Sequence, residues 1–281
     1  MKKLLCFLLS CMMVPCAFSF AAAEEEPKTQ YRYKKCSLEV PVGERTIRGV
    51  LYMPKNADHD VPVAICCHGY TGTYTTFQYL CDQLARKGVA VAAFDFYGGS
   101  VSSISGGSML EMSVETEQEE LDAVLDEVVS REGINAEQCF ILGHSQGGYV
   151  CTLEATRHPE KVAAMFLYAP AFHIAETMTA MFPDQDNIPE RTQIGAGSIG
   201  PKYVLDVWGT DIYAEMSKYT GPVEIVHGDA DSDVPVSYSE RAVEAFPNAH
   251  LTVIEGMDHS LPDSVADVLI TKVMEKVDAS K

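Results

Sequence analysis

Residues 143–147, Gly-His-Ser-Gln-Gly, place a serine between two glycines, directly after an apolar run and just before a helix-like stretch. This is the pattern G-x-S-x-G, in which a sharp strand-to-helix turn exposes a serine hydroxyl at the edge of a sheet. The glycines are needed because larger neighbours would collide with the turn. The N-terminus of the following helix favours developing negative charge. The pattern therefore predicts Ser145 as a nucleophile, with a plain tight turn as the alternative.

A serine hydroxyl is a weak nucleophile and needs a general base. In folds with this turn the chain order is serine, then acid, then histidine. His259 lies in EGMDHSLPD, between the last predicted strand and the last predicted helix. His250 begins a strand and His227 ends one in a His-Gly turn, so both are interpreted as structural. We predict that His259 is the base.

The acid that orients the base is expected after the preceding strand, in the segment VEIVHGDADSDVP. Asp229, Asp231 and Asp233 are the candidates there. The acid accepts the imidazole N–H and holds the tautomer of the base. Spacing alone does not choose among the three, and the other two are expected to cap the turn or face water.

An acyl-transfer site also needs backbone N–H groups that stabilise the oxyanion. One belongs to Gln146, the residue after the nucleophile. The second is expected in the loop CCHGYTG after the third strand, where Tyr70 follows a His-Gly turn. His68 is expected to pack beneath the site. A simple tight turn at His68 and Gly69 is compatible with this role, because the donor is backbone.

Strands alternate with helices along the chain, and the inner strands, such as VPVAICC and VAVAAFDF, are continuously apolar. These features indicate an α/β fold with a mostly parallel sheet covered on both faces. SLEVPV and TIRGVLYM, around Gly43-Glu44, predict an antiparallel edge. Residues 173–221 are too long for one crossover helix, so we predict an inserted cap of short helices.

The bulk composition excludes some classes of partner. The formal net charge is −19, and no basic run is present, which argues against nucleic acid and against anionic membrane surfaces. The stretch GAGSIG at 195–200 matches G-x-G-x-x-G, but it follows PERTQ rather than a strand and Pro201 comes next. It is interpreted as a flexible cap loop and not as a dinucleotide site. No cofactor is expected.

The N-terminal segment has two lysines, an apolar stretch, then small residues and acids, which is the layout of a secretory signal peptide. We predict a signal peptide over 1–23 and one domain over 24–281, exported to the periplasm or secreted, with no stable membrane association after cleavage. A retained membrane anchor and a lipid anchor at Cys11 or Cys16 are weaker alternatives.

Six cysteines remain beyond the predicted signal peptide. Cys66, Cys67 and Cys139 lie in apolar strand-like runs, so buried free thiols are favoured over disulfides. The chain has no C-x-x-C pair and no H-E-x-x-H motif, and no metal site is predicted.

Together these pieces resemble the α/β-hydrolase superfamily over nearly the whole chain after the signal peptide, and more narrowly the bacterial cinnamoyl (feruloyl) esterases. The resemblance is carried by the stretches LYMPKN, HGYTG, DFYGG, GHSQGG, YAPA and KYTGPVEIVHGDADSDVP. It implies a mostly parallel eight-stranded sheet with helices on both faces and a small cap over about 173–221, which forms an aromatic-acid pocket in that family.

The resemblance also implies site residues. The family's acid is the fifth residue of H-G-x-x-D-x-x-V-P, which corresponds to Asp231, and the aromatic residue after His-Gly corresponds to Tyr70. One loop departs from the family, where Y-G-H-G-x-S is usual. Here it reads Tyr97-Gly98-Gly99-Ser100-Val101-Ser102, without the histidine.

The expected function is that of an exported serine carboxylesterase that acts through an acyl-enzyme on hydroxycinnamoyl or related esters, either small molecules or oligosaccharide-linked esters. A serine peptidase or an acetyl esterase on the same fold is the first alternative. A non-catalytic ligand-binding relative is the second. A homodimer is compatible with the sequence.

Overall fold

The structure is a computed structural model that describes residues 30–280. Residues 1–29 and Lys281 lie outside the described residues, and the predicted signal peptide falls entirely among them. Across the described range, no helix combines the length and the apolar character needed to span a bilayer.

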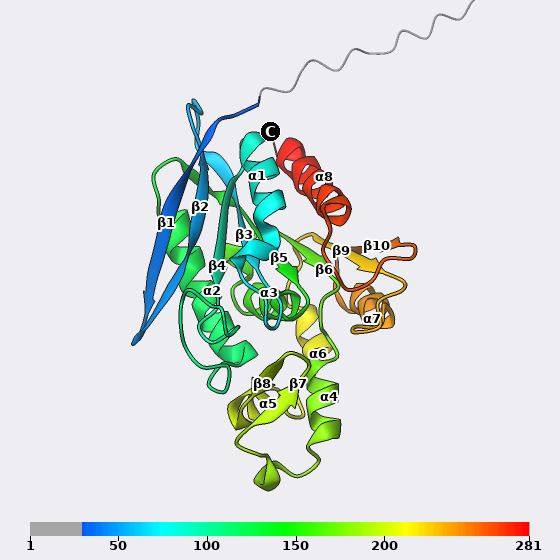
Figure 1. Cartoon of the computed structure of the whole chain (residues 1–281). Coiled ribbons are helices and arrows are strands. Elements are labelled where there is room, and N and C mark those ends of the chain that lie inside the picture. Colours follow the sequence, from blue (N-terminus) through cyan, green and yellow to red (C-terminus); the bar gives the residue numbers. More distant parts are fainter. Residues whose placement is uncertain (1–29, 281) are drawn as a thin grey trace, which may run out of the picture.

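Eight strands form one sheet in the order β1-β2-β4-β3-β5-β6-β9-β10 (Figure 1). β2 pairs antiparallel with β1 and with β4, and every other pair of neighbours is parallel. The prediction of a mostly parallel eight-stranded sheet with an antiparallel edge is confirmed. The strands are β1 (Tyr33–Val42), β2 (Arg45–Pro54), β3 (Val61–Cys67), β4 (Ala90–Asp95), β5 (Ile134–His144), β6 (Ala164–Tyr168), β9 (Val223–Gly228) and β10 (Ala249–Ile254).

Helices cover both faces of this sheet (Figure 1). α2 (Val114–Val129), α3 (Gln146–Arg157) and α7 (Ser237–Ala245) pack on one face, and α1 (Gln78–Arg86) and α8 (Asp263–Ala279) pack on the other. Short 3-10 turns extend the connections at η1 (Tyr74–Phe77) and η2 (Pro159–Lys161). The fold class predicted from the sequence is therefore confirmed.

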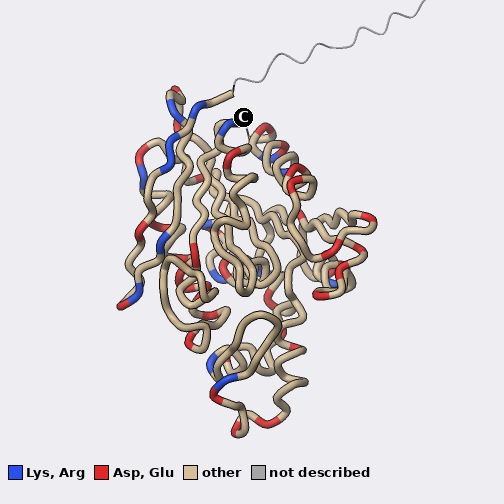
Figure 2. The backbone as a smooth tube through the Cα atoms, in the orientation of Figure 1, with Lys and Arg blue, Asp and Glu red and all other residues tan. Residues whose placement is uncertain are grey.

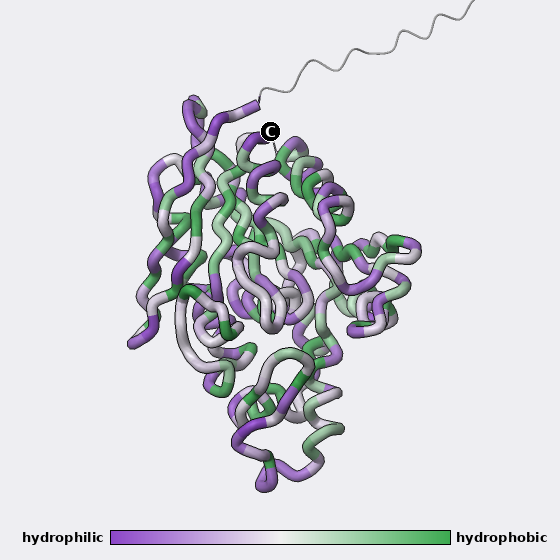
Figure 3. The backbone as a smooth tube through the Cα atoms, viewed as in Figure 1, coloured by the Kyte–Doolittle hydropathy of each residue, from purple (hydrophilic) through white to green (hydrophobic). Residues whose placement is uncertain are grey.

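The buried inner strands explain the continuous apolar runs. All seven residues of β3 are buried, and successive side chains serve opposite layers. Cys67 belongs to the core under α2 and α3, while Cys66 belongs to the core under α1 and α8. Figure 3 shows the hydrophobic stretches gathered on these central strands. Cys66, Cys67 and Cys139 are buried and unpaired, as the sequence predicts.

Charged residues lie mainly outside this core. Figure 2 shows Asp and Glu spread over the helices and the cap, while several Lys and Arg lie along the β1–β2 edge. α2 begins with a capping box, in which the Ser113 hydroxyl accepts the N–H of Thr116 and the Thr116 hydroxyl accepts the N–H of Ser113.

The segment between β6 and β9 lies beyond the end of the main sheet (Figure 1). It contains short helices and also a two-stranded antiparallel sheet, in which β7 pairs with β8. The stretch interpreted as a flexible loop is therefore the turn and second strand of a hairpin, and that interpretation is corrected. The elements are α4 (Ile174–Met181), η3 (Gln185–Asn187), β7 (Thr192–Ile194), β8 (Gly197–Ile199), α5 (Pro201–Val207) and α6 (Ile212–Met216).

Close packing explains the glycines of this hairpin. A Cβ on Gly197 would lie 2.6 Å from the Tyr70 hydroxyl, and a Cβ on Gly200 would lie 2.1 Å from the Leu110 carbonyl oxygen. The hairpin thus rests on the loops that follow β3 and β4. Gly195 has a different role, because its φ of +51° favours a residue without a side chain at the tip.

Candidate active site

The turn between β5 and α3 holds Ser145 in a strained conformation. Its φ is +55°, which is uncommon for a residue with a side chain. A Cβ on Gly147 would lie 2.0 Å from the Cys67 carbonyl oxygen, and a Cβ on Gly143 would lie 2.5 Å from the Gly147 carbonyl oxygen. Both flanking glycines are therefore required, and the strained turn presents the Ser145 hydroxyl at the carboxyl edge of the sheet.

The structure brings Ser145, His259 and Asp231 into one hydrogen-bonded chain. The Nε2 atom of His259 lies 2.9 Å from the Ser145 hydroxyl oxygen, and its Nδ1 atom lies 2.7 Å from Oδ2 of Asp231. A carboxylate only accepts, so Nδ1 carries the hydrogen and Nε2 is free to accept the serine proton. The His259 side chain is 20% exposed and the Asp231 side chain is fully buried.

The other two acid candidates do not reach the base. Asp229 is exposed and accepts the N–H of Gly256 at 2.6 Å, so it caps a turn. Asp233 is exposed as well. Among the three aspartates, the structure places only Asp231 against His259.

Hydrogen bonds keep the Asp231 carboxylate ionised and oriented. Burial raises its pKa, but the N–H of Val234 and the ring of His259 outweigh that effect, and the pKa lies below the ordinary value. Oδ1 accepts the N–H groups of Asp233 and Val234 at 2.9 and 2.8 Å. His227 buttresses the same turn by donating to the Val234 carbonyl oxygen at 2.8 Å. This structural role agrees with the sequence interpretation of His227.

Two backbone N–H groups beside the serine lack acceptors. Neither the N–H of Gln146 nor that of Tyr70 donates to any of the described residues. Gln146 begins α3, where an N–H has no intrahelical partner. Gly69, next to Tyr70, approaches the nucleophile so closely that a Cβ on it would lie 2.8 Å from Cβ of Ser145. These two free donors are the predicted oxyanion pair.

His68 holds the loop that carries Tyr70. The N–H of Phe96 donates to Nε2 of His68 at 3.1 Å, so the ring hydrogen sits on Nδ1, which donates to the Gly69 carbonyl oxygen at 2.8 Å. Burial lowers the pKa of His68, and the ring stays neutral. A Cβ on Gly99 would lie 2.9 Å from the His68 ring, so this departure from the family pattern packs directly on the loop support.

Two aromatic residues fix the loop of the base, and sequence reasoning missed both. His144 donates from Nε2 to the His259 carbonyl oxygen at 3.0 Å, and Tyr168 donates to the Asp258 carbonyl oxygen at 2.8 Å. Their rings stack with a 5.4 Å centroid separation. Burial lowers the pKa of His144 to about 4, which keeps the ring uncharged beside His259. His144 occupies the first variable position of the G-x-S-x-G motif. A histidine at this position was the sequence signal that could have identified it as part of the site.

A buried network extends from the oxyanion turn toward the cap. The Gln146 side chain donates to Glu117 of α2 at 2.8 Å and accepts from the Tyr203 hydroxyl of α5 at 2.7 Å. Glu117 is buried, and this burial raises its pKa well above the usual value. The side chain of Gln146 therefore links a sheet-covering helix to the cap, while its backbone N–H stays available.

Two buried polar atoms next to the site have no partner among the described residues: the hydroxyl of Tyr70 and Nδ1 of His173. Burial raises the pKa of Tyr70 to about 12. Tyr70 lies on the oxyanion loop, and His173 begins the cap. His250, by contrast, is 73% exposed on β10 and takes no part in the site.

A model of the family described as serine aminopeptidase, S33 (Hydrolase_4) matches residues 59–205, which is more than half of the chain. The chain belongs to this family of α/β-hydrolases. The matched range contains Tyr70, Ser145 and Gln146, while Asp231 and His259 lie beyond it.

Individual relatives agree with this family. The monoacylglycerol lipase of Mycolicibacterium smegmatis is 23% identical over 236 residues, which cover 71% of this chain and 81% of that protein. Est1E of Butyrivibrio proteoclasticus, solved with ferulic acid bound, superposes with a TM-score of 0.78 at 25% identity, covering 86% of this chain and 99% of Est1E. α/β-Hydrolase domain-containing protein 10 from mouse shares the fold, with a TM-score of 0.69 at 19% identity, covering 88% of this chain and 100% of that protein.

This α/β-hydrolase is therefore an enzyme of the esterase and lipase type. The resemblance stated from the sequence is confirmed at the level of the superfamily, and a solved structure with ferulic acid is among its structural neighbours.

Proposed function

We propose that this protein is a serine carboxylesterase that hydrolyses hydroxycinnamoyl (feruloyl-type) esters through an acyl-enzyme. The observation that carries the catalytic part is the chain from Asp231 through His259 to Ser145, set beside the two unpartnered N–H groups of Tyr70 and Gln146. A nucleophile, an oriented base and two oxyanion donors are the parts that acyl transfer needs.

The reaction follows from the geometry in two halves. Ser145 attacks the ester carbonyl while Nε2 of His259 takes its proton, and the oxyanion accepts from the N–H groups of Gln146 and Tyr70. The alcohol then leaves with the proton from His259, and an ester bond to Ser145 remains. Water, deprotonated by His259, attacks that ester and releases the acid and the free serine.

The acyl preference is supported by the likeness to Est1E, whose structure holds ferulic acid. The loops around the nucleophile carry a second indication. The unpartnered Tyr70 hydroxyl lies between the oxyanion loop and the cap hairpin, and a phenolic acyl group brings an oxygen that accepts such a bond. An aliphatic chain would leave this hydroxyl without a partner.

Hydrolysis of a panel of esters tests this assignment. Methyl ferulate, p-nitrophenyl acetate and a monoacylglycerol are offered to the wild type and to Ser145→Ala. We expect turnover of methyl ferulate with the highest kcat/KM, lost in the variant. Turnover of the acetate alone would support the catalytic triad but contradict the feruloyl assignment. Turnover in Ser145→Ala would contradict both.

A second candidate is an acylglycerol lipase, which the Mycolicibacterium relative favours. The same panel separates the two, because a lipase would prefer the monoacylglycerol over methyl ferulate. A peptidase, which the family description suggests, would cleave aminoacyl amides faster than matched esters.

We propose in addition that the protein is exported, on the basis of the layout of its N-terminal 23 residues. Expression of the full chain in a bacterial host, followed by fractionation and intact-mass measurement, tests this. A periplasmic or secreted product that starts at Glu24 would support it. A cytoplasmic product that retains Met1 would contradict it.

A further inference from the structure

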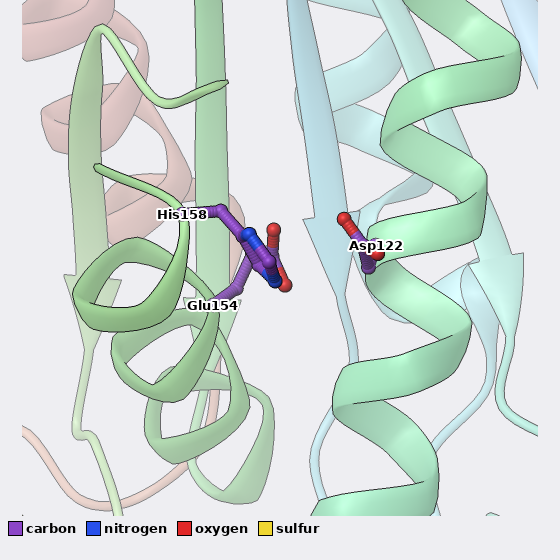
Figure 4. Close-up of side chains that lie close together, drawn as sticks. All are labelled: Asp122, Glu154 and His158. Carbon is purple, nitrogen blue, oxygen red and sulfur yellow. The ribbon is translucent and has the colours of Figure 1, made fainter. Parts of the chain in front are cut away.

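Three side chains with metal-ligating atoms converge at the end of α3 remote from Ser145 (Figure 4). Asp122 comes from α2, Glu154 from the last turn of α3, and His158 from the residue that ends it. One ligating atom of each lies within 4.8 Å of the others. Glu154 and His158 are four positions apart, a spacing that places side chains on one helix face.

One carboxylate oxygen of Glu154 is buried without a hydrogen-bond partner among the described residues. The residue is fully buried, and its Oε1 atom has no hydrogen-bond partner among the described residues. A buried polar atom without a partner is costly, and a buried carboxylate more so, unless a cation or donor compensates it. The other oxygen, Oε2, accepts from Nε2 of Gln118 at 2.6 Å. Oε1 is therefore the atom that a ligand would satisfy.

A second layer of contacts fixes the orientation of Glu154. Arg157 donates to Oε1 of Gln118 at 2.7 Å, which turns the amide nitrogen of Gln118 toward Glu154. Glu115 holds Arg157 in turn through two bonds of 2.7 and 2.8 Å. Supporting hydrogen bonds of this kind orient ligating carboxylates in metal sites.

The local charge is not balanced by protein cations. Lys161 lies 2.5 Å from Oδ1 of Asp122 and 2.7 Å from Oδ1 of Asp126. Burial raises the pKa of Glu154 to about 7, and when this carboxyl ionises three carboxylates face one ammonium, an excess of two negative charges. A divalent cation would remove that excess by binding between the carboxyl groups of Asp122 and Glu154, which lie close together, while Lys161 holds Oδ1 of Asp122.

We propose that Asp122, Glu154 and His158 bind a divalent transition-metal ion such as Zn²⁺. One imidazole and two carboxylates suit Zn²⁺ better than Ca²⁺ or Mg²⁺, which prefer oxygen ligands alone. The ion ties the C-terminal end of α3 to α2 and so braces the helix whose first residue supplies an oxyanion donor. The sequence expectation of no metal site rested on contiguous motifs, and these ligands come from two helices.

Titration of chelator-treated full-length protein with ZnCl₂ in a calorimeter tests the proposal. We expect one ion per chain and a Zn²⁺-dependent rise in Tm, because an ion that binds only the folded state stabilises it. Asp122→Asn and His158→Gln should each weaken binding at least tenfold and abolish the rise in Tm. His59→Gln, which alters an exposed His-Asp pair elsewhere, should change neither.

Several results would overturn the proposal. Unchanged binding in Asp122→Asn and His158→Gln would do so, as would loss of binding in His59→Gln or in Asp231→Asn instead. Equal affinity for Ca²⁺ would contradict the transition-metal assignment. A Tm that rises in Glu154→Gln without any Zn²⁺ effect on the wild type would show that Glu154 and Asp122 merely share a proton.

Discussion

Asp231 differs from its two neighbouring aspartates by its burial and by its hydrogen bond to His259. Its side chain is fully buried and lies 2.7 Å from Nδ1 of His259, whereas Asp229 and Asp233 are exposed. This contrast allows a test at the level of one residue, because the three carboxyls sit within five positions of the same turn.

Asp231→Asn should lower kcat by about 10⁴, the loss seen when the acid of a Ser-His-Asp triad becomes an amide that stabilises the wrong tautomer. Asp229→Asn is the matched control and should change kcat less than threefold. Steady-state hydrolysis of p-nitrophenyl acetate measures both. Comparable losses in the two variants would contradict the assignment of Asp231.

His144 acts on the reaction through the position of His259. Its Nε2 hydrogen holds the carbonyl of the base, and its neutral ring adds no charge nearby. His144→Phe should lower kcat about tenfold while KM changes little, because the loop of the base loses an anchor. His144→Gln keeps a donor at the matching position and should recover most of that loss. Equal losses in both variants would point to packing rather than to the hydrogen bond.

At the scale of elements, the cap hairpin and the loops after β3 and β4 form one contact surface. Glycines make this possible, because the hairpin backbone approaches Leu110 and Tyr70 more closely than a side chain permits. The close approach of the hairpin therefore depends on these glycines, while buried cap side chains such as Tyr203 and Val204 pack into the core under α2 and α3.

Gly200→Ala should destabilise the protein by about 1–3 kcal/mol and raise KM for methyl ferulate, since its Cβ would lie 2.1 Å from a backbone oxygen. The backbone of Gly200 is extended, so the contact alone accounts for the effect. Gly195→Asn is the control, because the tip has open space and asparagine tolerates its φ. Urea unfolding and steady-state kinetics measure the outcome. Equal stability of the two variants would mean that the hairpin is not tightly docked.

α2 carries a buried acid whose ionisation opposes folding. Burial raises the folded-state pKa of Glu117 well above 4.5, its ordinary value. Below the unfolded pKa both states hold the proton. As pH rises past it, the unfolded chain ionises first, so stability falls until the folded pKa is reached.

Glu117→Gln removes this dependence. Between pH 5 and pH 8, the stability of the variant relative to the wild type should rise by at most about 1.4 kcal/mol per pH unit. Urea unfolding at four pH values in this range measures the difference, which cancels the contributions of other titrating groups. A difference that is constant with pH would mean that Glu117 ionises in the folded protein.

At the scale of the whole molecule, the features that could be predicted from the sequence are those that local residue patterns encode. Apolar runs and the Gly-rich turn at Ser145 were enough to predict the sheet, its antiparallel edge and the chain order of the nucleophile and the base. The acid was not decided by spacing, because three aspartates share one turn and only burial against His259 separates them.

Other features depend on contacts between distant segments, and no local pattern marks them. His144 and Tyr168 act on backbone carbonyls of residues 258 and 259, which any sequence would offer. The cap hairpin is short and rich in glycine, so it has little strand signal of its own. Asp122, Glu154 and His158 meet only because α2 packs on α3.

The central claim is that an ester passes its acyl group to Ser145. Acid quenching of the wild type during turnover of methyl ferulate, followed by peptide mass spectrometry, tests this directly. The account predicts one feruloyl group on the peptide that contains Ser145, and neither adduct nor turnover in Ser145→Ala. Turnover without an adduct at Ser145, retained in Ser145→Ala, would contradict it.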